Sequence, residues 1–315
     1  MSATDSEPFR TGPHNRKFDW FATLACLSAL TCWSVAPIFI KLLTGVLDSW
    51  TQNALRYGVA CLFWLPFLVA VNRNGTFDRR IWKLALLPSA MNIFTQSCFT
   101  ASFYSIDPAF VDLTGKSSIL WIMGFSLLLF PHERALLKSK RFWSGMALSA
   151  AGLLGVIAFH EGFGQKREMT GVAWTQIAAV GWAAYTLTIR LRFANIDSRA
   201  GFAVISLYTT AGLTVLALLF GRTEACLALS ARQWIWVVFS AILGIAISHV
   251  LYYSALRRIG AMIPSLVMLA VPFCILSLSH WVFGETLTAM QWPFGVMLLA
   301  GAGLAIWSQE HLRWT

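Results

Sequence analysis

Long apolar stretches alternate with short polar ones along nearly the whole chain. Ten of the apolar stretches approach the length of about 20 residues that a helix needs to cross a hydrocarbon core. Only helices and closed barrels satisfy their own backbone in lipid, and a barrel would give a far weaker, alternating pattern. The pattern therefore predicts an all-α integral membrane protein with ten transmembrane helices, at 20–43, 50–71, 81–103, 108–130, 142–160, 171–193, 201–220, 234–256, 261–283 and 287–307.

The two halves of this pattern resemble each other. In the first predicted helix Trp33 is followed eight positions later by Lys41, and in the sixth Trp182 is followed eight positions later by Arg190. Because each half holds five helices, an odd number, the second copy must enter the membrane inverted, an arrangement typical of transporters. We predict inverted repeats at 20–160 and 171–307, an outer connecting loop at 161–170, and cytoplasmic tails at 1–19 and 308–315.

Composition and charge agree with a membrane location. Only 12% of the 315 residues are charged, against about 25% in soluble proteins. The net charge of +10 lies in short basic clusters between the apolar stretches, so lipid headgroups and topology account for it and we expect no nucleic-acid partner. With the N-terminus in the cytoplasm, seventeen of the 24 Lys and Arg residues fall inside, and six, Arg56 among them, fall outside or at the outer helix ends. This bias predicts an inner (plasma) membrane protein with both termini cytoplasmic.

Two opposite charges lie within the fourth predicted helix. Asp112 and Lys116 are four residues apart, so they share one helix face and can neutralise each other. Lys116 follows Pro108 by eight residues, which places it about 12 Å below the start of the helix. Ionisable groups at this depth normally face a protein interior or a water-filled path, so we expect the pair to contribute to a substrate site. The alternative is a salt bridge that only pins this helix to its neighbours.

Other polar and aromatic residues lie at comparable depth. Asn92 and Gln96 share one face of the third helix and can offer amide groups to a ligand, or hold the bundle by interhelical hydrogen bonds. Trp33 and Trp182 occupy matching positions of the two repeats, and with Tyr185 they are candidates for the walls of a central cavity, although a role in core packing is an open alternative.

Three further residues are candidates for proton coupling or bending. His249, near the inner half of the eighth helix, can shuttle a proton, as can Asp112; a buried histidine that is merely hydrogen-bonded is the alternative. Pro37 and Pro272 interrupt helices and free backbone carbonyls, so they are candidate hinges. The six cysteines show no CxxC spacing, and we expect neither a metal site nor a cofactor.

Several motifs together resemble the ten-helix EamA-type carriers of the drug/metabolite transporter superfamily. They comprise the spacing of Trp33 and Lys41, the glutamates Glu133 and Glu285 after the fourth and ninth helices, Pro272, and the last helices rich in Gly and Ala. The resemblance implies an exporter of amino acids, related metabolites or drugs, with the fourth and ninth helices beside a central cavity. It thus implies that Asp112 and Lys116 line the transport path.

The second repeat departs from the first where the charges lie. With a shift of 152 residues, Lys116 matches Met268 and Leu120 matches Pro272. The cavity is therefore expected to be charged on one side only.

These residues predict a secondary transporter that exports small amphipathic metabolites such as amino acids by alternating access. One alternative is proton-coupled efflux of cationic drugs or other metabolites, with Asp112 binding the cation or proton. A membrane enzyme is a second alternative, but Asp107 and Asp112 lie on different helix faces, and HExxH and GxSxG motifs are absent. A channel is a third, and no ring of like charges is visible. The sequence leaves a monomer and a homodimer equally open.

Overall fold

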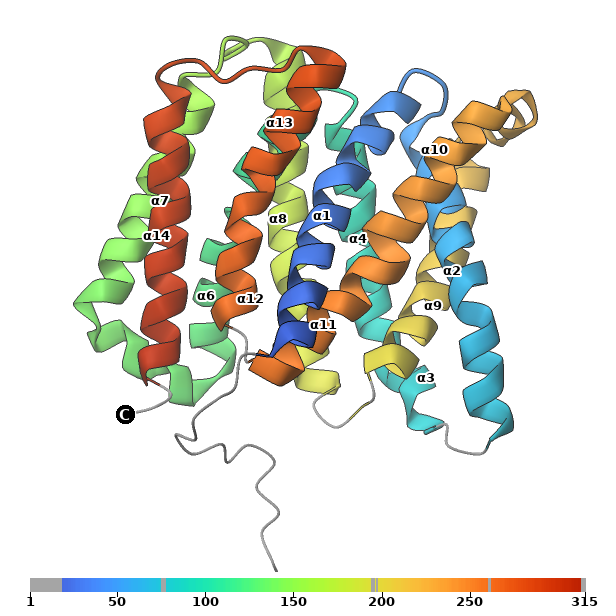
Figure 1. Ribbon diagram of the computed structural model, residues 1–315, viewed down its shortest axis with the longest axis horizontal. Helices are drawn as coiled ribbons and strands as arrows, with labels where there is room; N and C mark the ends of the chain where they lie inside the picture. Colours follow the sequence, from blue (N-terminus) through green and yellow to red (C-terminus); the bar gives the residue numbers. More distant parts are fainter. Residues whose placement is uncertain (1–18, 75–77, 194–195, 197, 260–261, 313–315) are drawn as a thin grey trace, which may run out of the picture.

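The computed structural model describes residues 19–74, 78–193, 196, 198–259 and 262–312. Within these ranges every regular element is helical, and the helices form one bundle that the chain traverses up and down (Figure 1). As drawn there, the upper end carries the connection between α1 and α2, and the C-terminus lies at the lower end. The fold class expected from the apolar pattern is confirmed.

The first repeat contains five crossings of the bundle. Two of these crossings are divided, the third into α3 and α4 and the fourth into α5 and α6. The elements are α1 (Trp20–Leu43), α2 (Ser49–Arg73), α3 (Arg80–Leu84), α4 (Leu86–Ser102), α5 (Pro108–Gly115), α6 (Ser118–Leu129), the 3₁₀ helix η1 (Pro131–Lys138) and α7 (Lys140–Ala158).

The second repeat has the same order with different interruptions. Its third crossing, the eighth of the bundle, contains a π-helix, and its fourth, the ninth of the bundle, contains a 3₁₀ turn. The elements are α8 (Lys166–Arg192), α9 (Ser198–Phe220), η2 (Thr223–Ala228), α10 (Ala231–Ala241), the π-helix η3 (Ile242–Ile247), α11 (Ser248–Ile259), α12 (Met262–Val267), η4 (Met268–Ala270), α13 (Val271–Phe283) and α14 (Gln291–Leu312).

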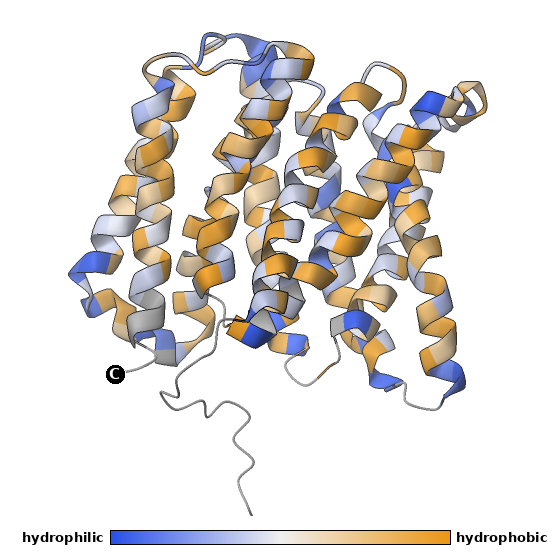
Figure 2. Cartoon of the chain, in the orientation of Figure 1, coloured by the Kyte–Doolittle hydropathy of each residue, from blue (hydrophilic) through white to orange (hydrophobic). Residues whose placement is uncertain are grey.

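The helices are mostly hydrophobic along their length, and many of the strongly hydrophilic residues lie near the helix ends (Figure 2). Large side chains such as Leu128, Leu218 and Trp281 are exposed on the outer surface. Such a surface suits a hydrocarbon environment, in which each helix satisfies its own backbone. Six stretches of the described chain are long and apolar enough to cross a membrane, namely Trp20–Leu43, Ser49–Arg73, Lys140–Ala158, Arg199–Phe220, Ala231–Tyr252 and Ile263–Phe283.

The helix expected at 108–130 is interrupted beside Lys116. α5 ends at Gly115 and α6 begins at Ser118, because hydrogen bonds of the tighter 3₁₀ kind replace the α-helical ones. The Ser117 amide donates to the Thr114 carbonyl at 3.2 Å, and the Ile119 amide to the Lys116 carbonyl at 3.0 Å. The charged pair therefore lies at a break in a helix.

The first turn of α8 lies inside the segment expected as a connecting loop. The helix begins at Lys166, whereas the loop was expected to run from 161 to 170. Residues 166–168 are charged, and Lys166 and Arg167 are exposed, so the helix continues beyond the apolar stretch from which it was predicted.

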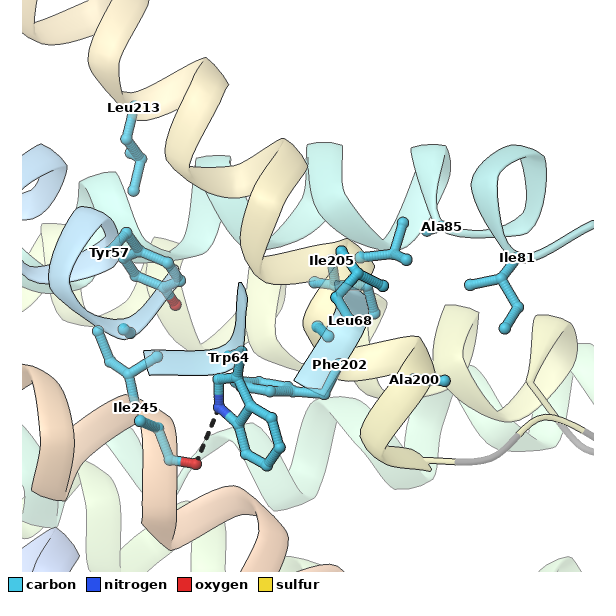
Figure 3. Close-up of a cluster of buried hydrophobic side chains, with 14 of the residues drawn as sticks. Tyr57, Trp64, Leu68, Ile81, Ala85, Ala200, Phe202, Ile205, Leu213 and Ile245 are labelled. Carbon is cyan, nitrogen blue, oxygen red and sulfur yellow. Dashed lines mark hydrogen bonds between the residues drawn. The ribbon is translucent and has the colours of Figure 1, made fainter. Parts of the chain in front are cut away.

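The two repeats are packed together at both edges of the bundle. At one edge α7 and α14 approach so closely that a Cβ on Gly152 would lie 2.3 Å from the Leu298 backbone nitrogen. At the other edge, large side chains of α2 and α9 form a buried cluster (Figure 3). In that cluster the Trp64 indole donates to the Ala246 carbonyl of the π-helix at 3.2 Å. The space between the two edges is where residues of both repeats can meet.

Candidate functional site

Asp112 and Lys116 form an ion pair inside the bundle. The Lys116 Nζ lies 3.1 Å from the Asp112 Oδ2, and the two side chains are 17% and 20% exposed. The predicted pairing over one helical turn is thus present. Because the ammonium already has a carboxylate partner, a ligand that binds Lys116 must compete with Asp112.

Gln176 of the second repeat supports the break that carries this pair. Its amide nitrogen donates to the Thr114 carbonyl at 3.2 Å, and its amide oxygen accepts from the Ser117 hydroxyl at 2.8 Å. The break is therefore satisfied by a side chain from α8, as irregular backbone within a membrane requires. Gln176 was missed in the sequence because a single glutamine in an apolar helix has no partner until the break is known.

Trp33 and Trp182 meet around His249 between the repeats. The His249 ring centroid lies 5.5 Å from that of Trp33, 6.3 Å from that of Trp182 and 5.0 Å from that of Phe202. The His249 Nδ1 is 3.1 Å from the Ile245 carbonyl of the π-helix, so the nitrogen donates there. The structure thus brings the two matching tryptophans to one aromatic cluster, with the predicted histidine at its centre.

The other predicted polar side chains, Asn92, Gln96 and Tyr185, do not gather at one place. The Asn92 amide is buried and donates to the Tyr57 and Thr209 hydroxyls, both at 3.1 Å. It ties α4 to α2 and α9. Gln96, one turn away, is half-buried, and its backbone carbonyl accepts from the Asn53 side-chain amide at 2.7 Å. Tyr185 is buried beside Trp182, with ring centroids 5.5 Å apart.

The two predicted hinge prolines have different settings. Pro37 is buried within the uninterrupted helix α1. Pro272 lies two residues after the end of the 3₁₀ turn η4, in the first turn of α13. Since proline has no amide hydrogen, it cannot bond the carbonyl of Met268, and the interruption of the ninth crossing follows from this.

Charged groups join helix ends at the upper end of the bundle. The Lys41 Nζ lies 3.0 Å from the Asp107 Oδ1 and donates to the Ile106 carbonyl at 2.8 Å. Glu285 accepts from the Ala109 and Phe110 amides at 3.0 and 2.9 Å, so its carboxylate caps the first turn of α5.

A matching arrangement occurs at the lower end. The Arg190 Nη2 lies 2.6 Å from the Glu133 Oε1, and Glu133 also accepts from the Ser126 hydroxyl. Arg190 stacks over the Phe130 ring at 3.9 Å. Lys41 and Arg190, like Glu133 and Glu285, hold matching repeat positions, so the inverted repeat places one cation and one glutamate at each end.

A cavity of about 510 Å³ opens at the upper end, above the charged pair. Its lining carries the carboxylates of Asp107, Glu161, Glu168 and Glu285. Burial raises the pKa of Glu285, although the Ser279, Ala109 and Phe110 hydrogen bonds act against this shift. Burial lowers the pKa of His160, because it disfavours the charged form of the imidazole; the ring stacks on Phe110 with ring centroids 4.0 Å apart. Carboxylates thus dominate the charged groups that line this cavity.

A catalytic metal has no visible site in the described part of the chain. No group of three or more His, Cys, Asp or Glu side chains there could hold an ion. Asp107 and Asp112, the two carboxylates considered for an enzyme, each pair with a different lysine. Their geometry is that of two ion pairs.

Comparisons with known proteins agree with the arrangement in two repeats. The model of the EamA-like transporter family matches the chain twice, at residues 20–158 and 169–307. An uncharacterized transporter of Archaeoglobus fulgidus is 25% identical over 281 residues, which cover 89% of this chain and 93% of that protein. A protein of known crystal structure is similar with a TM-score of 0.63 and 18% identity, over 90% of this chain and 96% of the other. At that identity the likeness concerns the fold alone.

Proposed function

The chain belongs to the EamA-like transporter family, and from this premise we propose that it exports small amphipathic metabolites such as amino acids by alternating access. The observation that carries the proposal is the ion pair of Asp112 and Lys116 at a helix break held by Gln176 of the other repeat. Interrupted helices near the interface of inverted repeats are where secondary transporters bind their substrates.

The chemistry of the pair favours a zwitterion. A carboxylate on the cargo can take the place of Asp112 at the Lys116 ammonium, while an amino group on the cargo takes the place of Lys116 at Asp112. Each ion then exchanges one partner for another and is never left unpaired, which keeps the cost of binding low. The aromatic cluster of Trp33, Trp182 and His249 supports an amphipathic side chain on the cargo.

The second candidate is efflux of organic cations coupled to protons. In that mechanism Asp112 alone binds the cation or the proton, and Lys116 only tunes the carboxylate. The acidic cavity at the upper end supports this candidate because carboxylates such as Glu161 and Glu168 attract cations. The two candidates differ in which member of the pair is indispensable.

Uptake into sealed vesicles containing the purified protein tests the proposed function. We expect saturable uptake of labelled amino acids, accelerated by unlabelled amino acid on the opposite side. A channel would show neither property, and an enzyme would alter its substrate. Uptake of organic cations alone would contradict the amino-acid proposal and support the second candidate.

We also propose an inner-membrane location with both termini in the cytoplasm, because seventeen of the 24 basic residues then lie inside. A reporter that is active only in the cytoplasm, fused to Thr315, is expected to be active. The assay measures reporter activity per fusion protein in the membrane. A silent fusion that is nonetheless stably inserted would reverse the proposed orientation.

A further inference from the structure

Arg56 is a buried cation on α2 whose charge has no partner in the described part of the chain. Its side chain is 2% exposed, and its Nε and Nη1 make no hydrogen bond there. No carboxylate of the described residues forms an ion pair with it. At the sequence level Arg56 was counted among the basic residues at outer helix ends, so its position inside the bundle is a finding of the structure.

The polar residues beside Arg56 on α2 are, in contrast, all satisfied. The Gln52 amide donates to the Ile40 carbonyl at 2.8 Å and accepts from the Tyr104 hydroxyl at 2.9 Å. Asn53 donates to the Gln96 carbonyl and accepts from the Thr100 hydroxyl at 2.8 Å. A face of α2 that satisfies Gln52 and Asn53 but leaves two buried nitrogens of the Arg56 guanidinium without a hydrogen bond indicates a site for something that is not part of the chain.

Arg56 lies where the two repeats meet. A Cβ built on Gly244 of the π-helix would lie 3.5 Å from the Arg56 Nη2 and 2.9 Å from the Ala36 Cβ of α1. The guanidinium is therefore next to both α1 and the π-helix, and glycine at position 244 leaves room for them to approach. Short π-helical segments are frequent at functional sites.

The guanidinium also lies at the depth of the charged pair. Arg56 follows the start of α2 by seven residues and Lys116 follows the start of α5 by eight, and both helices begin at the upper end. At about 1.5 Å per residue, both cations are about 10 to 12 Å below that end. This layer thus holds two cations, Arg56 and Lys116, and one carboxylate, Asp112.

We propose that Arg56 binds an anionic group of the cargo, so that the site selects molecules with a net negative charge. A buried ion without a partner is strongly unfavourable, and an anion that enters with the cargo removes that penalty. A guanidinium stays charged under physiological conditions, so deprotonation cannot remove the free-energy penalty of burying it. The inference rests on the proposed function and narrows its substrate class, small amphipathic metabolites, to those with a net negative charge, such as acidic amino acids and organic acids; a zwitterion without a further acidic group is then expected to bind less tightly.

The test compares three probes that share a phenyl group and differ in charge. 3-Phenylpropionate is an anion, L-phenylalanine a zwitterion and 2-phenylethylamine a cation. Binding to purified wild-type protein and to Arg56→Met is measured by the rise in melting temperature with probe concentration. We expect wild type to prefer 3-phenylpropionate, and Arg56→Met to lose about tenfold or more of that affinity relative to L-phenylalanine.

Two further variants keep the test independent of folding. Arg56→Lys retains the charge, so it is expected to keep the preference for the anion at lower affinity. Arg79→Gln removes an exposed arginine at the start of α3 and is expected to bind all three probes as wild type does. Without a probe, Arg56→Met is expected to melt at a higher temperature than wild type, because the unpaired buried charge is gone.

Several results would overturn the inference. Equal affinity of wild type and Arg56→Met for 3-phenylpropionate would do so while leaving amino-acid export intact. A lower melting temperature of Arg56→Met without probe, with unchanged relative affinities, would assign Arg56 to packing. Failure of wild type to prefer the anion would remove the narrowed substrate class, whereas failure of vesicle uptake for every amino acid would remove the proposed function itself.

Discussion

Lys116→Met is expected to abolish amino-acid export while the protein still inserts into the membrane. Methionine has nearly the same length as lysine and already occupies the matching position of the second repeat, Met268. The change leaves the half-buried Asp112 without its cation, and removing one partner of a buried pair costs at most about 3 to 5 kcal/mol. If that energy is lost from cargo binding, transport falls by about 100-fold or more. Uptake rates in sealed vesicles, divided by the amount of inserted protein, measure the effect.

Asp112→Asn and the double variant separate binding from structure. A purely structural salt bridge predicts that Asp112→Asn combined with Lys116→Met restores transport, because the pair is removed as a unit. A binding role predicts that the double variant stays inactive although it is as stable as wild type. Export of amino acids by Lys116→Met at near wild-type rates would refute the carboxylate role of the lysine. Organic-cation export that survives Lys116→Met and is lost in Asp112→Asn would support the second candidate.

Gly152→Ala is expected to destabilise the folded protein by about 3 kcal/mol, at the upper end of the range for overpacked cores. The added Cβ would lie 2.3 Å from the Leu298 backbone nitrogen and 2.8 Å from the Phe294 carbonyl oxygen. Backbone atoms cannot turn aside as a side chain can, so α7 and α14 must separate. The melting temperature in detergent measures the loss.

Gly124→Ala is the matched control. Gly124 lies within α6, and a Cβ there would meet no atom within 4 Å. Alanine favours a helix over glycine by about 0.5 to 1 kcal/mol, so this variant is expected to melt at or slightly above the wild-type temperature. Equal melting temperatures for Gly152→Ala and wild type would show that the two helices are less closely packed than the structure describes.

The fold could be predicted from the sequence because a segment that crosses lipid must be helical, apolar and about 20 residues long. Length and apolarity located α1 to the residue, Trp20–Leu43, and the family match confirmed two repeats. The break beside Lys116 was not predicted in this way, because residues 108–130 contain no internal proline, and Gly115 with the serines after it is also compatible with a continuous helix. Its cause is tertiary, since Gln176 of a distant helix satisfies the freed groups.

The candidate site was only partly predictable for the same reason. Repeat symmetry brought out Trp33 and Trp182, and the structure places both around His249. Spacing within one helix predicted the pairing of Asp112 with Lys116. Arg56 has no partner at helical spacing, so local patterns assigned it to a helix end. Its burial follows from how α2 rotates against α1 and the π-helix, which a single sequence does not specify.

The two edges of the bundle differ in mechanical stiffness. At the edge formed by α7 and α14, backbones touch at Gly152, and the Ser149 hydroxyl donates to the Leu298 carbonyl at 2.9 Å. This seam resists both sliding and separation. At the opposite edge the contact is made by side chains such as Trp64 and Phe202, which can change rotamer. If the repeats move during transport, we expect the α7–α14 edge to move least and the edge with Trp64 and Phe202 to move most.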